Sequence, residues 1–210
     1  MIPIGVDAPI FEWPKSNIVI LVLATILSFI VFASGNYNLV VSSGIDFQLT
    51  TYMFAHADFW HLFGNMYFLW LFGNPISGLI AWWKYLLFFF LAGVFSGIAH
   101  HIFENAAIIG ASGAINGVVG FFLVLFPNSK INCLFFAFRF AYVFEIRSYL
   151  VILFWFVVDF SGTFYSNDSI AYVGHVSGFL FGVIVGCIAA YYNLIYVAGD
   201  TLVDKFKKQI

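Results

Sequence analysis

Six long apolar segments constrain the fold of this chain more than any other feature of its sequence. A bilayer core about 30 Å thick is crossed by a helix of roughly 20 mostly apolar residues. The candidate segments are 17–34, 59–79, 83–103, 113–126, 146–164 and 170–192. Only 9% of the residues are charged, whereas a soluble domain carries about 25%, so the chain cannot cover itself with a water-soluble surface. The sequence predicts an all-α, polytopic membrane protein with six transmembrane helices.

The fourth segment is the shortest, and Gly-Ala-Ser at 110–112 precedes it. A short helix is tolerated in a membrane where other helices surround it and its end faces a wet cavity. Residues 1–15 lack the basic start and the small-residue cleavage site of a secretory signal, so the first segment is expected to remain as a helix. Residues 1–210 are interpreted as one membrane domain, with a core at about 17–192 and short cytoplasmic tails.

The basic residues assign an orientation to these helices. They lie before the first segment, between the second and third, between the fourth and fifth, and after the sixth. They are Lys15, Lys84, Lys130, Arg139, Arg147, Lys205, Lys207 and Lys208. Loops rich in Lys and Arg stay on the cytoplasmic side. Both termini are therefore predicted to be cytoplasmic, and the second, fourth and sixth helices begin on the outer side.

Composition argues against several other classes of protein. The formal net charge of −2 points to no nucleic-acid partner. Cys133 and Cys187 are far apart in the sequence and are interpreted as lone thiols, not as a metal site or a disulfide framework. A small transporter or channel would carry ionisable residues deep in several helices, or inverted repeats. The sequence has neither pattern.

Unusual polar residues occur near the outer ends of three predicted helices. His61 and Asn65 lie near the start of the second helix, Ser112 at the start of the fourth, and His175 near the start of the sixth. Ionisable groups inside a membrane are costly and therefore indicate function. Their common depth predicts a single site that opens to the extracytoplasmic side.

Ser112 is a candidate nucleophile. Gly110 and Gly113 bracket it, and glycine allows a tight turn and the close approach of another backbone. Free N–H groups at a helix N-terminus favour negative charge, so the same turn could hold the oxyanion of a tetrahedral intermediate. The alternative is that this serine only caps the helix or fills a small-residue interface.

His175 is the candidate base. Small-residue stripes occur on its helix and on the fourth helix, and such stripes let membrane helices pack closely. The stripes are Gly174, Gly178, Gly182 and Gly186, and Gly113, Gly117 and Gly120. If these faces meet, the imidazole lies within reach of the serine and could accept its proton and return it to the leaving amine. The alternative is a histidine that only bonds between helices.

His61 and Asn65 are spaced by four residues and share one helix face. Both side chains can donate hydrogen bonds, so both could stabilise a developing oxyanion. The alternative is an interhelical polar contact, which Asn65 taken alone would favour.

These motifs resemble the rhomboid family of intramembrane serine proteases in its bacterial, six-helix form. GASGA at 110–114 is similar to the family's nucleophile motif, and Gly174-His175 is similar to its base motif. His61-x-x-x-Asn65, with the preceding TTYMFAHADFW, is similar to its second-helix motif. The resemblance extends from about Phe47 to Tyr192.

The resemblance implies a Ser112–His175 dyad without a third, acidic member. His61, Asn65 and the Ser112 backbone N–H would form the oxyanion hole. Substrates would be single-span membrane proteins, cut near the outer face at small residues, in a bacterial inner membrane. No cofactor or metal is expected. The alternative is an inactive relative that binds membrane helices, although such relatives usually lack the serine or the histidine.

The sequence departs from the family pattern at two places. Asn116 stands where an aromatic residue often packs against the catalytic histidine, which indicates another means of holding that ring and a lower activity. Phe47-Gln48 replaces a common Trp-Arg pair in the first outer loop. His56 matches a family histidine and is interpreted as structural support for this loop.

Other polar residues receive structural interpretations. His100 and His101 point about 100° apart on a helix and are expected at the membrane interface. Asp159 is interpreted as a local cap or an interfacial acid, and the alternative is that it supports the water of the site. In the fifth helix, Phe154 and Trp155 belong to a Phe-rich segment that the resemblance identifies as a movable gate for substrate.

Overall fold

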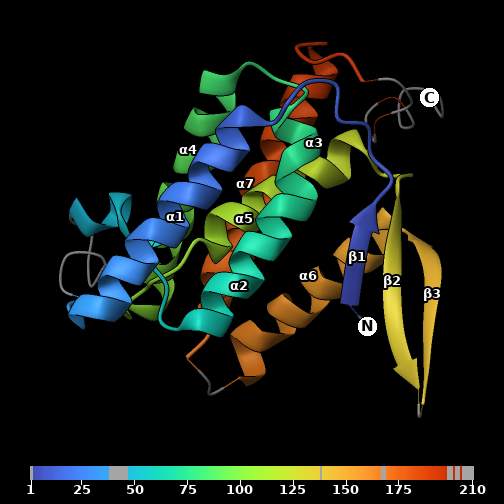
Figure 1. The fold of residues 1–210 in the computed structure, drawn as a ribbon. Helices are drawn as coiled ribbons and strands as arrows, with labels where there is room; N and C mark the ends of the chain where they lie inside the picture. The colour runs from blue at the N-terminus through green and yellow to red at the C-terminus, as the bar shows by residue number, and fades with distance from the viewer. Residues whose placement is uncertain are drawn as a thin grey trace.

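The computed structural model describes residues 2–37, 47–137, 139–166, 169–197, 201 and 204. Its helices form a bundle, and a small sheet lies at one side (Figure 1). The longer helices are α1 (Lys15–Ser34), α4 (Trp82–Glu104), α5 (Ser112–Leu125), α6 (Ser148–Tyr165) and α7 (Tyr172–Tyr191). Between α1 and α4 lie η1 (Phe47–Thr50), η2 (Tyr52–Phe54), α2 (Phe59–Phe68), η3 (Leu69–Gly73) and α3 (Asn74–Ser77). The chain is mostly helical, and helix occurs in each of the six apolar segments.

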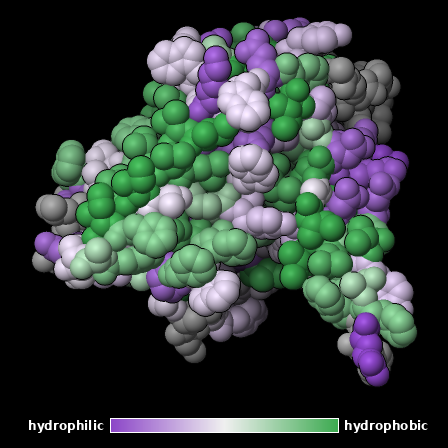
Figure 2. Space-filling model, viewed as in Figure 1, coloured by the Kyte–Doolittle hydropathy of each residue, from purple (hydrophilic) through white to green (hydrophobic). Residues whose placement is uncertain are grey.

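Four helices, α1, α4, α6 and α7, are long and apolar enough to cross a membrane, and α5 is a shorter apolar helix. Large apolar side chains on α1 are exposed, as an apolar band shows in Figure 2. They include Val19, Val22, Leu23, Ile26, Phe29 and Ile30. A contiguous apolar surface of this kind marks contact with a membrane or a partner.

The second apolar segment folds as one interrupted helix. α2 passes into the π-helical turn η3 and then into α3. A π turn leaves the regular hydrogen-bond ladder, and Asn17 of α1 compensates for it. Its Nδ2 donates to the Leu69 carbonyl at 3.0 Å and to Asn74 Oδ1 at 2.8 Å, while Tyr85 donates to its Oδ1 at 2.6 Å. This buried polar cluster ties α1, α4 and the second segment together.

The short helix α5 occupies the centre of the bundle. From Gly113 to Leu125 nearly all of its residues are buried, as expected for a short membrane helix that other helices surround. Its glycine face packs directly on that of α7. A Cβ added to Gly178 would collide with the Gly113 carbonyl oxygen, and one added to Gly182 with the Gly117 carbonyl oxygen. The two predicted glycine stripes therefore meet.

The three-stranded antiparallel sheet departs from the all-α prediction. β1 (Ile2–Val6), β2 (Lys130–Ala137) and β3 (Phe140–Arg147) lie in the order β1-β2-β3. Two eight-residue runs, rich in apolar residues and separated only by 138–139, are typical of a β-hairpin. Sequence analysis interpreted this region as a loop between helices. The hairpin projects away from the helices in Figures 1 and 2.

Candidate active site

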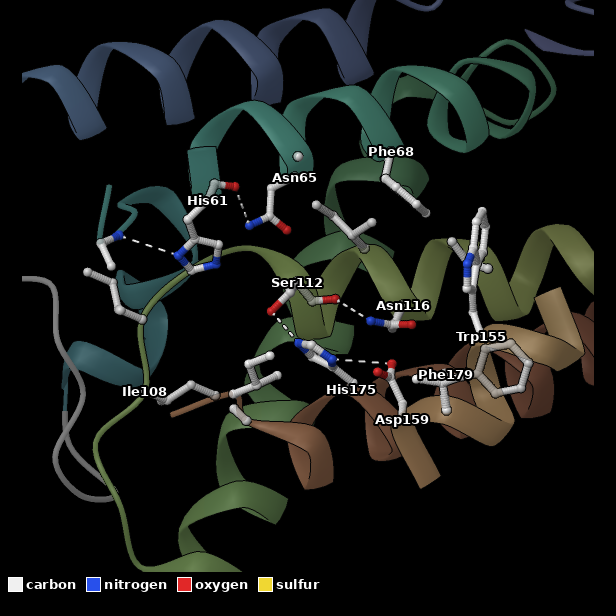
Figure 3. Close-up of a pocket in the computed structure, with 18 of the residues that line it drawn as sticks. His61, Asn65, Phe68, Ile108, Ser112, Asn116, Trp155, Asp159, His175 and Phe179 are labelled. Atoms are coloured by element: carbon white, nitrogen blue, oxygen red, sulfur yellow. Dashed lines mark hydrogen bonds and ion pairs between the residues drawn. The ribbon is translucent and has the colours of Figure 1, made fainter. Parts of the chain in front are cut away.

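A cavity of about 740 Å³ opens where α2, α5, α6 and α7 approach one another. Most of its lining is apolar, and its polar side chains come from four separate helices. These include His61, Asn65, Ser112, Asn116, Asp159 and His175. Figure 3 shows them facing a common space. A concave, mostly apolar pocket with a few converging polar groups is the usual form of an active site.

Ser112 and His175 are in direct contact. Ser112 Oγ lies 2.8 Å from His175 Nε2, within hydrogen-bond distance. Ser112 is the first residue of α5, and His175 lies in the first turn of α7. Close packing of the two glycine faces brings these helix ends together. The structure thus brings together the predicted nucleophile and base.

Two glycines make this contact possible. Gly110 has a φ of +109°, which L side chains rarely adopt, and an added Cβ would lie 2.6 Å from His61 Cε1. An added Cβ on Gly113 would collide with Ser96 Oγ, which donates to the Gly174 carbonyl at 2.8 Å. The turn into α5 therefore needs glycine for its backbone at Gly110 and for space at Gly113.

His61 and Asn65 lie on the opposite wall of the cavity from His175 (Figure 3). The Ala57 N–H points to His61 Nδ1 at 3.4 Å. With Nδ1 as an acceptor, the imidazole proton is on Nε2, the nitrogen beside Gly110. Asn65 Nδ2 donates to the His61 carbonyl at 3.0 Å, and an amide nitrogen carries a second N–H. Each of these two side chains therefore has an N–H group available to the cavity. The first backbone N–H groups of α5 are available as donors as well.

His56, which sequence analysis assigned to support of the loop before α2, contacts both α1 and the turn before Ser112. It is fully buried in the loop between η2 and α2. Its Nδ1 lies 2.9 Å from Ser28 Oγ of α1, and its Nε2 faces the Ala111 N–H at 3.4 Å. Burial, followed by the nearby His61, lowers the pKa of His56 to about 3, against a smaller opposing effect of Asp58. The ring therefore stays neutral and can accept from Ala111.

Asn116 does not replace the aromatic ring that often occupies its position in the family. Its Nδ2 donates back to the Ser112 carbonyl at 3.0 Å. Asp159 of α6 instead reaches the other edge of the His175 ring, with Oδ2 at 3.2 Å from Nδ1. Sequence analysis interpreted Asp159 as a cap or an interfacial acid and implied no third, acidic member. In the structure this carboxylate lies beside the His175 ring.

His100 and His101, which are expected at the membrane interface, are buried inside the protein, with exposed fractions of 2% and 7%. His100 Nδ1 lies 2.9 Å from Glu104 Oε2, one turn further along α4. The carboxylate balances an imidazole that α4 would otherwise bury alone. Within the described residues, no group of three or more His, Cys, Asp and Glu side chains is arranged to hold a metal ion.

The two aromatic residues of the expected gate face different environments. Trp155 lines the cavity, and its ring centroid lies 4.9 Å from that of Phe68 on α2. Phe154 points outward and is 59% exposed. In the first outer loop Phe47 is also exposed, whereas Leu49 and Tyr52 are buried against α4. The Phe47 side chain is therefore not what anchors this loop.

Comparison with known proteins identifies the family. Residues 43–192 match the sequence profile of the Rhomboid domain. The chain is 32% identical over 145 residues to the mitochondrial Rhomboid protein 1 of Saccharomyces cerevisiae, covering 63% of this chain and 39% of that protein. It is 34% identical over 100 residues to the putative rhomboid protease YdcA of Bacillus subtilis, covering 46% of this chain and 50% of that protein.

A third relative, Rhomboid-related protein 1 of Caenorhabditis elegans, is 30% identical over 156 residues, covering 70% of this chain and 41% of that protein. The matched regions span half or less of the length of these relatives. The profile match covers most of the chain and includes every residue of the Ser112–His175 site. This chain belongs to the rhomboid family of integral membrane proteins.

Proposed function

We propose that this protein is an intramembrane serine protease that cuts membrane-protein segments near the extracytoplasmic face with a Ser112–His175 dyad. The observation that carries the proposal is the 2.8 Å contact between Ser112 Oγ and His175 Nε2 inside the cavity. A serine hydroxyl is a weak nucleophile until an adjacent base accepts its proton. The contact supplies that base without any third component.

The proposed reaction has two halves. As Ser112 Oγ attacks the scissile carbonyl, its proton passes to His175 Nε2. The tetrahedral intermediate then collapses, the C–N bond breaks, and the imidazolium returns the proton to the leaving amine. Water, deprotonated by the same imidazole, attacks the acyl-enzyme and releases Ser112. His175 serves as base and acid in turn, which requires one ring nitrogen aimed at the reacting atoms.

The oxyanion is the charge that the site must stabilise. We assign this role to His61 Nε2–H, the Asn65 amide and the Ser112 backbone N–H. The His61 tautomer inferred from Ala57 leaves a donor on the cavity side, and the first N–H groups of α5 lack intrahelical partners. Loss of one such donor costs about 10²–10³ in kcat in a soluble serine protease. Gly110, Gly113, Asn116 and His56 hold this constellation in place.

The proposed topology has six spans in one membrane domain, with α2, η3 and α3 counted as one span, α5 as another, and both termini cytoplasmic. Support comes from the distribution of charge. Lys15, Lys84, Lys130 and Arg147 lie at or next to the ends of α1, α4, α5 and α6 that are remote from Ser112. Loops rich in Lys and Arg remain cytoplasmic. The cavity then opens to the outer side of what we propose is a bacterial inner membrane.

The proposed substrates are single-span membrane proteins. The Trp155–Phe68 contact closes the cavity between α6 and α2, so a helix arriving from the bilayer would enter by displacing Trp155. Residues at the cleavage point must adopt an extended form to reach Ser112, because a helical backbone hides its carbonyl groups in the i→i−4 ladder. The preference for small residues at that point is part of the proposal and comes from the resemblance to the family.

The test is cleavage of a single-span reporter in proteoliposomes by the wild-type chain and by Ser112→Ala. Cleavage by wild type alone is expected. Ser177→Ala is the matched control, because this serine lies two residues beyond His175 on α7, with its hydroxyl donating to the Gly174 carbonyl. A serine-reactive phosphonate should label Ser112 in the wild type and in the control. If no reporter is cut and Ser112 is not labelled, the inactive, helix-binding alternative replaces the protease.

A further inference from the structure

We propose that Asp159 is a positioning residue that orients the His175 imidazole, so that the site works as a Ser–His–Asp triad. The inference rests on the proposed protease function and extends it to a residue on a fourth helix. Three side chains lie in a row: Ser112 Oγ, 2.8 Å from His175 Nε2, and His175 Nδ1, 3.2 Å from Asp159 Oδ2 (Figure 3).

The chemistry of the base is favoured by such a partner, although it does not depend on one. To accept the serine proton, His175 Nε2 must be unprotonated, so the neutral ring must carry its proton on Nδ1. A carboxylate beside Nδ1 favours that tautomer and stabilises the imidazolium that forms, while remaining ionised itself. In this structure the 3.2 Å contact is an ion-pair distance without hydrogen-bond geometry.

The position of Asp159 argues against a role in helix stability. It lies in the last two turns of α6 (Ser148–Tyr165). An ionised carboxylate has no proton to donate to the free carbonyl groups at a helix C-terminus, so it cannot cap this end. A carboxylate within a membrane-spanning segment is costly. Within the part of the chain that the structure describes, its ionic contact is with His175. The interaction that offsets the cost of this carboxylate is therefore its contact with His175, the proposed base.

Contacts on either side of Asp159 hold it in place. One turn before it, the Phe156 ring packs on Phe179 of α7 at a centroid distance of 4.8 Å. One turn after it, the Gly162 backbone approaches the Tyr172 ring so closely that an added Cβ would lie 2.5 Å from it. The side chains of Asp159 and His175 are 22% and 16% exposed. The carboxylate is thus fixed against α7 and only partly reached by water.

The first measurement is cleavage kinetics for wild type, Asp159→Asn, Asp159→Glu and Ser161→Ala. In soluble triad proteases the Asp→Asn change lowers kcat by about 10⁴, and we expect a smaller loss of about 10–100-fold here because the contact is longer. KM should change less than about twofold, since Asp159 does not touch the scissile bond. Asp159→Glu should recover much of the rate. Ser161→Ala, an exposed change near the same end of α6, should leave it unchanged.

The second measurement does not depend on cleavage. Nitrogen-15 NMR of labelled histidine in detergent reports which His175 nitrogen carries the proton, assigned with His175→Gln. We expect Nδ1–H in wild type, and a shift towards Nε2–H in Asp159→Asn, whose amide can donate to Nδ1. The same tautomer in both proteins, unchanged kcat in Asp159→Asn, or an equal loss in Ser161→Ala would overturn the proposal. A wild type that does not cut, yet shows the tautomer shift, would refute the protease and retain the positioning role.

Discussion

The two sides of the cavity are built from different contacts. On one side α5 and α7 meet through a glycine interface, formed by Gly113, Gly117, Gly178 and Gly182, in which backbone touches backbone. On the other side α6 meets α2 through an aromatic contact between Trp155 and Phe68. A backbone interface leaves no side chain that can rotate away, whereas an aromatic pair can part without disturbing either helix. The proposed nucleophile and base, Ser112 and His175, lie on the rigid side, and the aromatic side is suited to the proposed admission of substrate.

The distribution of buried residues along α5 and α6 supports the same contrast. The buried residues of α6 are Ser148, Val151 and Ile152, all in its first half, whereas α5 is buried along almost its whole length. The second half of α6, residues 157–165, has no residue as deeply buried as these, and regions with fewer buried residues open at lower free-energy cost. Asp159 lies in that half, so the proposed positioning of His175 depends on α6 remaining packed against α7.

The largest expected effect is chemical and lies on the rigid side. His175→Ala should lower kcat/KM by at least about 10³-fold, because the serine loses its base. Thermal unfolding in detergent should change little, since the ring is near the cavity and not in the glycine interface. Adding Ser112→Ala should cost nothing more, because both residues act in one step. A double variant much less active than either single one would contradict a shared step.

Next in size is a steric effect on the same side. Gly178→Val should lower the free energy of unfolding by about 3 kcal/mol or more, or a factor of roughly 100 or more in the folding equilibrium, because its Cβ meets the immobile Gly113 carbonyl. Gly64→Ala is the matched control, since an added Cβ there has nothing within 4 Å. Unfolding by heat in detergent measures both. Equal stability of the two variants would show that the glycine interface is not rigid.

A smaller effect is expected on the aromatic side. Aromatic pairs contribute about 0.5–1.5 kcal/mol beyond their buried area, so Trp155→Ala should ease separation of α6 from α2. If substrate admission limits turnover, the cleavage rate should rise about 5-fold, which corresponds to about 1 kcal/mol. Phe154→Ala, an outward-facing neighbour, is the control and should leave the rate unchanged. Equal effects of both substitutions would contradict a specific closure by Trp155.

The last effect is absent at neutral pH and develops only on acidification, and it concerns the loop before the proposed nucleophile. The pKa of His56 is about 3 in the folded chain and about 6.5 in an unfolded one. The unfolded state therefore binds the proton first. Stability is fully present above about pH 6.5 and falls as the pH is lowered towards 3. His56→Gln removes this titration, so its unfolding free energy should depend less on pH over that window. Parallel pH curves for both proteins would contradict a buried, neutral His56.

Sequence analysis anticipated most of the helices because apolar length is a local property. The predicted segments match the observed helices at their ends to within a few residues, from α1 to α7. It also anticipated the meeting of Ser112 and His175, because the glycine stripes indicated which faces would pack. The hairpin of β2 and β3 was missed because its strands lie between apolar helices in the sequence. A short run of apolar residues there does not distinguish a strand from a helix.

Other features were missed because they depend on contacts between helices. Whether an acid on α6 caps its own helix or approaches a histidine on α7 depends on how each helix is rotated about its axis. The sequence of α6 alone does not set that rotation. The same applies to His100 and His101, which lie inside the protein, and to Trp155 and Phe154, which are adjacent yet face opposite surroundings. The pairing of Asn17 with the π turn at Leu69 also joins distant segments.

By itself, the sequence determined that this chain enters a membrane, where its helices lie and which residues could perform acyl transfer. Hydrophobic length and charge act through the bilayer and need no knowledge of packing. The tertiary structure alone decided which polar groups touch. Distances of 2.8 Å and 3.2 Å around His175 arise from close backbone packing of α5 on α7 and from the rotation of α6. These are properties of the assembled helices, because each depends on the shape of a neighbour.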